Sequence, residues 1–87
     1  MSSSGAYWRL PAPPEGTFLG YRIMFLFDDP LTGGRYRGKW REVTDDWLPY
    51  LGGYHDACAD EELKGEVANL IALLEKHGRI EVCVSVD

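Results

Sequence analysis

Apolar side chains recur at helical spacing late in the chain, and they constrain the fold more than any other feature. Acidic residues 60–62 would occupy the first turn of this helix, and Lys76 and His77 the last. Gly78 would follow at the C-cap, so each terminus suits the helix dipole. The sequence predicts an amphipathic helix over residues 60–77 that must pack on an apolar surface. The apolar stripe consists of Leu63, Val67, Leu70 and Leu74.

Alternating apolar residues predict strands for this helix to cover. In residues 79–87 every second side chain is apolar, which is typical of a half-buried strand. In residues 17–27 one alternating set is apolar and the other is only partly polar, which indicates a central strand covered on both faces. The set expected to face the core is Leu19, Tyr21, Ile23, Phe25 and Phe27.

Two further segments complete the expected sheet. The turn-rich residues 28–34 would join 17–27 to a strand at 35–43 as a β-hairpin. Residues 7–10 are apolar enough for a short edge strand or a packed arm. A right-handed crossover through the helix would return residues 79–87 parallel to 35–43.

The predicted fold class is therefore α+β. We expect a small antiparallel or mixed sheet of three to four strands, in the order (β)-β-β-α-β, with one amphipathic helix on one face. That face would carry Leu19, Ile23 and Val82. Residues 1–6 are expected to form a mobile N-terminal tail, and residues 7–87 a single small domain, because 87 residues supply one modest core.

Positive charge is concentrated in one segment of an acidic chain, whose formal net charge is -5. Four cations alternate there, so a strand would present them on one face and turn Tyr36 and Trp40 toward the core. Arg22 would enlarge the cluster if it joined that face. Alternatively, the cations are solvated and pair across the sheet with Glu81 and Asp87. The four cations are Arg35, Arg37, Lys39 and Arg41.

Residues 47–54 read as an aromatic and glycine-rich loop. We expect Trp47 and Leu51 to close the core beneath the helix, since a small domain needs its large apolar side chains. Tyr50 and Tyr54 flank glycines and are expected to be partly exposed, where aromatic rings can bind a partner.

Residues that could carry chemistry are sparse. His55, Asp56 and Cys58 lie close together but lack the second ligand pair of a zinc site. Neither Cys58 nor Cys83 lies in a setting that activates a thiol, and no phosphate-binding glycine motif is present. We therefore predict no enzyme activity, no cofactor and no metal, with a small metal protein or enzyme as the third alternative.

These features favour a non-catalytic protein-binding module that inhibits or regulates a macromolecular partner with an acidic or mixed surface. Small acidic α+β chains of this kind are common among phage-type and immunity-type regulators, which is an analogy of class. The second alternative is a nucleic-acid-binding module that uses residues 35–41. The expected partner-binding residues are Arg22, Arg35, Arg37, Lys39, Arg41, Tyr50 and Tyr54.

Location and self-association follow from apolar patterning. No apolar run approaches the roughly 18 residues of a membrane span, and no signal peptide follows Met1. We therefore expect a cytoplasmic protein that does not act at a membrane. Phe18, Met24 and Leu26 would leave an apolar patch opposite the helix, which a second subunit could cover as a homodimer if residues 7–10 do not cover it.

Overall fold

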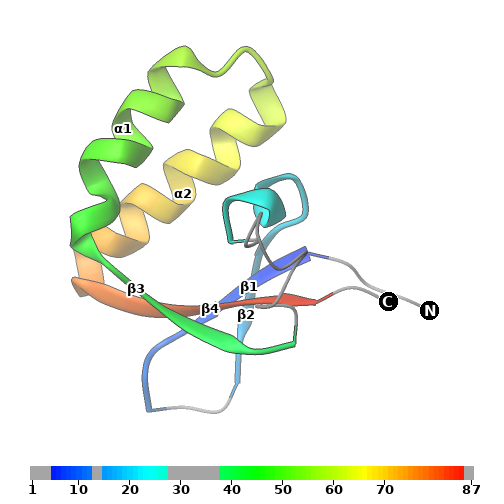
Figure 1. Ribbon diagram of the computed structural model, residues 1–87, viewed down its shortest axis with the longest axis vertical. Helices are drawn as coiled ribbons and strands as arrows, with labels where there is room; N and C mark the ends of the chain where they lie inside the picture. The colour runs from blue at the N-terminus through cyan, green and yellow to red at the C-terminus, as the bar shows by residue number, and fades with distance from the viewer. Residues whose placement is uncertain (1–4, 13–14, 28–37, 86–87) are drawn as a thin grey trace.

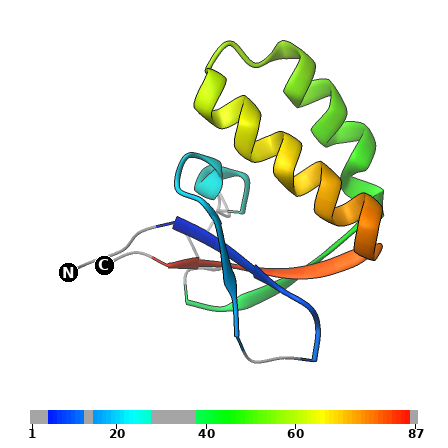
Figure 2. The same ribbon diagram turned by 180° about the vertical axis from the view of Figure 1, so that it is seen from behind.

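The computed structural model describes residues 5–12, 15–27 and 38–85, and within them a four-stranded antiparallel sheet carries helices on one face (Figures 1 and 2). This architecture confirms the predicted α+β class. The strands are β1 (Gly5–Arg9), β2 (Thr17–Gly20), β3 (Trp40–Thr44) and β4 (Arg79–Ser85). The helices are the 3-10 helices η1 (Arg22–Phe27) and η2 (Asp45–Trp47) and the α-helices α1 (Leu48–Ala57) and α2 (Glu61–His77).

The strand order is β2-β1-β4-β3, so β1 and β4 form the centre of the sheet. The predicted hairpin between 17–27 and 35–43 is wrong, because β2 pairs with β1 and β3 pairs with β4. The predicted edge strand at 7–10 is central instead. It begins at Gly5, inside the segment expected to be a tail, and Ala6 is fully buried.

The predicted parallel pairing of the last strand is also wrong. The 3-10 helix η2 and two α-helices, rather than one helix, connect β3 to β4, and α1 and α2 form a hairpin that returns the chain to the end of β3 (Figure 1). Thr44 therefore pairs with Arg79, and the Asp45 N–H donates to the Gly78 carbonyl at 3.0 Å. A strand that starts where its neighbour ends must run antiparallel to it.

The predicted central strand over 17–27 ends at Gly20, where the chain turns into η1. A Cβ atom at Gly20 would overlap the carboxylate of Glu66 on α2. That carboxylate accepts a hydrogen bond from the Ile23 N–H at 2.9 Å, within the first turn of η1. The long-range contact with α2 thus replaces the strand ladder beyond residue 20.

This turn changes which side chains face the core. Ile23 and Phe27 are buried as expected, but Tyr21 and Phe25 are 53% and 47% exposed. Leu26, expected on an outer patch, is 9% exposed and joins the core. The predicted dimer patch of Phe18, Met24 and Leu26 therefore does not form as one surface.

Helix α2 matches the predicted helix. Asp60 is the N-cap, and its Oδ1 accepts from the Leu63 N–H at 3.2 Å. Gly78 ends the helix with φ 76°, and its N–H donates to the Leu74 carbonyl at 2.8 Å. The whole predicted stripe is buried: Leu63, Val67, Leu70 and Leu74.

Helix α1 occupies the segment predicted as a loop. Gly52 and Gly53 lie in its centre and weaken the helical signal, since glycine is about 1 kcal/mol less favourable than alanine in a helix. Pro49 in the first turn suits a helix start. Leu51 is fully buried, so packing beside α2 stabilises a helix that propensity alone does not predict.

The two faces of the sheet differ in character. Ala6, Val43 and the even-numbered apolar residues of β4 lie beneath the helices and are buried. Trp40 lies on the opposite face, which corrects its predicted place in the core. Its ring is 3.9 Å from the Arg9 guanidinium carbon, and a Cβ atom at Gly16 would come within 2.6 Å of it. Trp40 thus covers part of the face that carries no helix.

Within the described residues, none of the helices combines the length and the apolar character needed to cross a membrane.

Candidate functional site

A row of aromatic rings joins η1, η2 and α1 on the helical side of the molecule. Neighbouring ring centroids lie 5.5 to 6.3 Å apart along the row. The row begins at a half-exposed ring of η1 and ends at Phe27, which is 1% exposed. We call its accessible part the aromatic surface, which consists of Phe25, Trp47, Tyr50 and Tyr54.

Exposure distinguishes this row from ordinary core packing. Tyr50 is 56% exposed, more than any other large hydrophobic side chain of the described residues. Phe25 lies 5.8 Å from Tyr54, so the two rings present one continuous apolar area. Contiguous exposed aromatic area is typical of interaction surfaces.

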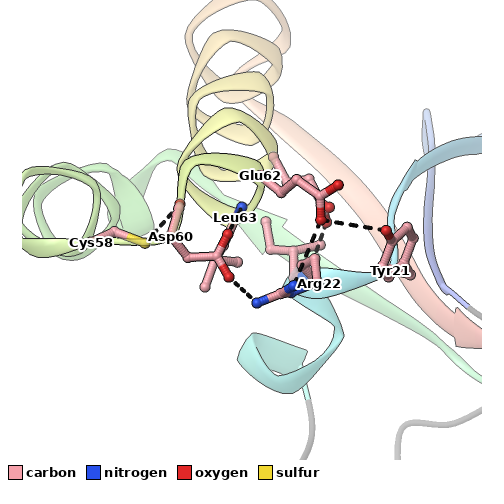
Figure 3. A network of polar contacts seen from close by, with 8 residues as sticks. Tyr21, Arg22, Cys58, Asp60, Glu62 and Leu63 are labelled. Atoms are coloured by element: carbon pink, nitrogen blue, oxygen red, sulfur yellow. Dashed lines mark hydrogen bonds and ion pairs between the residues drawn. The ribbon is translucent and has the colours of Figure 1, made fainter.

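A polar network holds η1 against the start of α2 (Figure 3). Phe25, also on η1, packs against Tyr54 of α1. Arg22 points from η1 to Asp60, with which it forms an ion pair, and its second nitrogen lies 3.6 Å from Glu62 Oε2. The Tyr21 hydroxyl donates to the same Glu62 oxygen at 3.4 Å. Exposed pairs of this kind contribute a few tenths of a kcal/mol each, so the network positions η1 more than it stabilises the fold.

A pocket of about 320 Å³ opens beside the aromatic surface. The Arg41 guanidinium carbon lies 5.1 Å from the centroid of the Trp47 ring, within the range of a cation–π contact. One carboxylate, one guanidinium and apolar walls therefore meet in a small volume. The pocket is lined by Leu26, Arg41, Asp46, Trp47 and Tyr50.

The predicted row of cations is only partly placed by the structure. Arg35, Arg37 and Tyr36 lie outside the described residues. Lys39 is exposed, whereas Arg41 is half-buried on the helical side of β3. Arg41 and Trp40 do point to opposite faces, but the faces are the reverse of those expected, since Arg41 lies toward the helices.

The partners expected for these cations are used elsewhere. Arg22 does not join the row, because it pairs with Asp60 and Glu62 at the start of α2. Glu81, expected to neutralise the row, accepts from Arg9 Nε at 2.8 Å. Asp87 lies outside the described residues.

The aromatic residues of the predicted site do come together. Tyr50 and Tyr54 lie 6.3 Å apart on α1, and Leu51 is buried between the helices as expected. The prediction missed Phe25, because alternation assigned it to the core face of a strand. It also missed Asp46 and Leu26, which only the meeting of η1, η2 and α1 brings to the pocket.

Two groups among the described residues, the Tyr54 hydroxyl and the Cys83 thiol, have shifted pKa values. Burial raises the pKa of the Tyr54 hydroxyl above its usual value of 10.0, and Cys58 and Tyr50 add to the rise. Burial likewise raises the pKa of the Cys83 thiol above 9.0, while a backbone hydrogen bond at Gly38 and the charge of Arg9 oppose the rise. Cys83 is therefore a neutral thiol near pH 7, which does not favour a nucleophile.

The candidate metal residues form only local contacts. His55 Nδ1 lies 3.6 Å from Asp56 Oδ1, and the Cys58 thiol donates to the Asp60 carbonyl at 3.5 Å. Across residues 5–12, 15–27 and 38–85, no three histidine, cysteine or acidic side chains are placed to share a metal ion.

Comparisons of the chain with protein-family models, with curated proteins and with solved structures found no match.

Proposed function

We propose that this chain is a non-catalytic protein-binding module that inhibits or regulates a macromolecular partner through the aromatic surface. The observation that carries the proposal is the exposure of Phe25 and Tyr50 within one continuous row of rings. Aromatic side chains supply much of the energy of protein interfaces. Burial of these rings in the neighbouring core would stabilise a monomer in water, so their exposure is better explained by a binding role.

The charge around the aromatic surface suits a protein partner. Arg41 and Asp46 contribute one positive and one negative charge at its edge. A nucleic-acid site would instead need several cations aligned with phosphates. The sequence also predicts that Arg35, Arg37 and Lys39 contact an acidic region of the partner.

Capture from native lysate tests the proposal. The tagged protein should retain a protein partner after nuclease treatment, and the variants Phe25→Ser and Tyr50→Ser should each lose it. Phe18→Ser is the matched control, because Phe18 is 49% exposed but pairs with Tyr7 on the opposite sheet face. Equal loss with all three variants would contradict a site at the aromatic surface.

The charge contribution needs its own test. Reversal of Arg37 and Lys39 to glutamate should abolish capture if the cations contact the partner. A captured species that disappears with nuclease, and whose binding weakens steeply and linearly in log salt, would instead indicate the nucleic-acid-binding alternative.

The remaining parts of the proposal are location and assembly. We expect a cytoplasmic protein in which Cys58 and Cys83 stay reduced, because thiols in the cytosol are normally kept reduced. A homodimer, if one forms, would use the aromatic surface rather than the predicted patch, because Leu26 is buried. Sedimentation of wild-type protein and Tyr50→Ser at high concentration distinguishes these states.

A further inference from the structure

The pocket beside the aromatic surface has a composition that specifies its occupant more closely than the surface does. Four elements meet there: Leu26 comes from η1, Arg41 from β3, and Tyr50 from α1. Asp46 and Trp47 come from η2, which connects β3 to α1. The pocket therefore depends on the folded arrangement of segments that are distant in the sequence.

The volume of the pocket matches a small guest. At about 320 Å³ it lies at the lower end of ligand pockets, which span roughly 300–1,000 Å³. That volume suits one large side chain. Protein interfaces concentrate most of their binding energy in a few residues that fill well-packed pockets.

The walls select the chemistry of that residue. Trp47 and Tyr50 offer ring surfaces and Leu26 an aliphatic one, so the guest should be apolar in its body. The opposite charges of Arg41 and Asp46 offset each other for a guest with a net charge, so neither sign is favoured. Together the guanidinium and the carboxylate present hydrogen-bond donors and an acceptor to a neutral polar group.

We propose that the pocket receives a tyrosine or tryptophan side chain of the protein partner as the anchor of the interface. The ring lies against Trp47 and Tyr50, while the phenol or indole hydrogen donates to Asp46. A tyrosine oxygen also accepts from Arg41. This inference rests on the proposed function, since it names the residue type that the aromatic surface captures.

A hydrogen bond from Thr44 supports the assignment of the Asp46 carboxylate as the acceptor. Thr44 Oγ1 donates to Asp46 Oδ2 at 3.4 Å, which holds the carboxylate near the start of η2. Asp45, the preceding residue, is also exposed and acidic but does not line the pocket. The two neighbouring acids therefore provide a matched pair for an experiment.

Binding of side-chain analogues to the purified full chain tests the inference without any partner. In a titration followed by NMR, p-cresol and 3-methylindole at millimolar concentration should shift the Leu26, Trp47 and Tyr50 resonances saturably. Toluene, which has the same ring but no hydroxyl, should bind roughly thirtyfold more weakly, as expected for the loss of the hydrogen bonds to Asp46 and from Arg41. Asp46→Ala should weaken p-cresol roughly fivefold, because the contact with Arg41 remains, whereas Asp45→Ala should leave its affinity unchanged.

Several results would overturn the inference. Toluene binding as tightly as p-cresol would exclude a polar contact, and equal effects of Asp45→Ala and Asp46→Ala would exclude the assigned acceptor. Tighter binding of tetramethylammonium or of uridine monophosphate would indicate a cation or a nucleotide site instead. Failure of p-cresol to bind, with partner capture still dependent on Phe25 and Tyr50, would reject the pocket and leave the proposed function standing.

Discussion

Replacing Ile23 by alanine should lower the free energy of unfolding much more than replacing Phe25, although the two residues are only two positions apart in the sequence. Ile23 is fully buried in η1, and truncation of a buried isoleucine costs about 3 kcal/mol, including the cavity it leaves. A fully buried phenylalanine would cost at least as much. Phe25 is 47% exposed, however, and its removal at the surface leaves no closed cavity.

We therefore expect Phe25→Ala to cost about 1 kcal/mol, near half the transfer term of a buried ring and part of its contact with Tyr54. The difference of about 2 kcal/mol corresponds to roughly 8–16 °C in Tm for a chain of this size. Urea unfolding followed by tryptophan fluorescence and by circular dichroism would measure it as a shift in the midpoint at constant slope.

The alternative structure makes the opposite prediction. If residues 17–27 formed one strand, Ile23 and Phe25 would share its core face, and both alanine variants would be severely destabilised. Equal losses from the two substitutions would therefore refute η1 and, with it, the exposure of Phe25 on which the proposed function depends.

Three further predictions concern a hydrogen bond, two glycines and a thiol. Glu66→Ala should cost about 1–2 kcal/mol, because the Ile23 N–H loses its acceptor, whereas the exposed Glu75→Ala should change the unfolding free energy by less than about 0.5 kcal/mol. Gly16→Ala should destabilise by about 1–3 kcal/mol through overlap with Trp40. Gly65→Ala should stabilise the fold by up to about 1 kcal/mol, since nothing lies within 4 Å of a Cβ atom there. Thermal unfolding should therefore show a lower Tm for Gly16→Ala and a higher Tm for Gly65→Ala. Because the Cys83 pKa is raised in the folded chain, the unfolded chain releases that proton first, so stability is retained below about pH 9 and falls as the pH rises through the folded pKa. Cys83→Ala should flatten this alkaline loss in a pH series of urea unfolding, and an unchanged slope would contradict the shift.

The parts of the fold that were predicted correctly are those set by local signals. Helix α2 carries its own cap at Asp60, its own stop at Gly78 and a stripe at regular spacing, so the neighbouring sequence suffices to define it. Strand β4 alternates strictly, and its even-numbered apolar residues are buried as expected. None of these signals depends on what the helix or strand packs against.

The errors arose where a distant contact decides the local structure. Residues 17–27 alternate like a strand, but Ile23, Leu26 and Phe27 also follow helical spacing, and the contact of Glu66 with the Ile23 N–H selects the helical turn. Helix α1 contains two central glycines, so only its packing beside α2 reveals it. Arg22 shows the same effect, because its partners at Asp60 and Glu62 lie 38 or more residues away.

The candidate site likewise contains residues that local sequence predicts and residues that only distant contacts bring together. Tyr50 and Tyr54 were predicted from their glycine-flanked position, a local property. Phe25 and the pocket were not predicted, because they depend on η1 lying against α1 and on η2 turning the chain after β3.

The central claim is that the aromatic surface binds the partner, and the most direct test is the NMR footprint of the captured protein on this chain. The largest changes in chemical shift should fall on Phe25, Trp47, Tyr50 and Tyr54. Changes concentrated instead on Tyr7, Phe18 and Trp40, on the sheet face without helices, would contradict the claim.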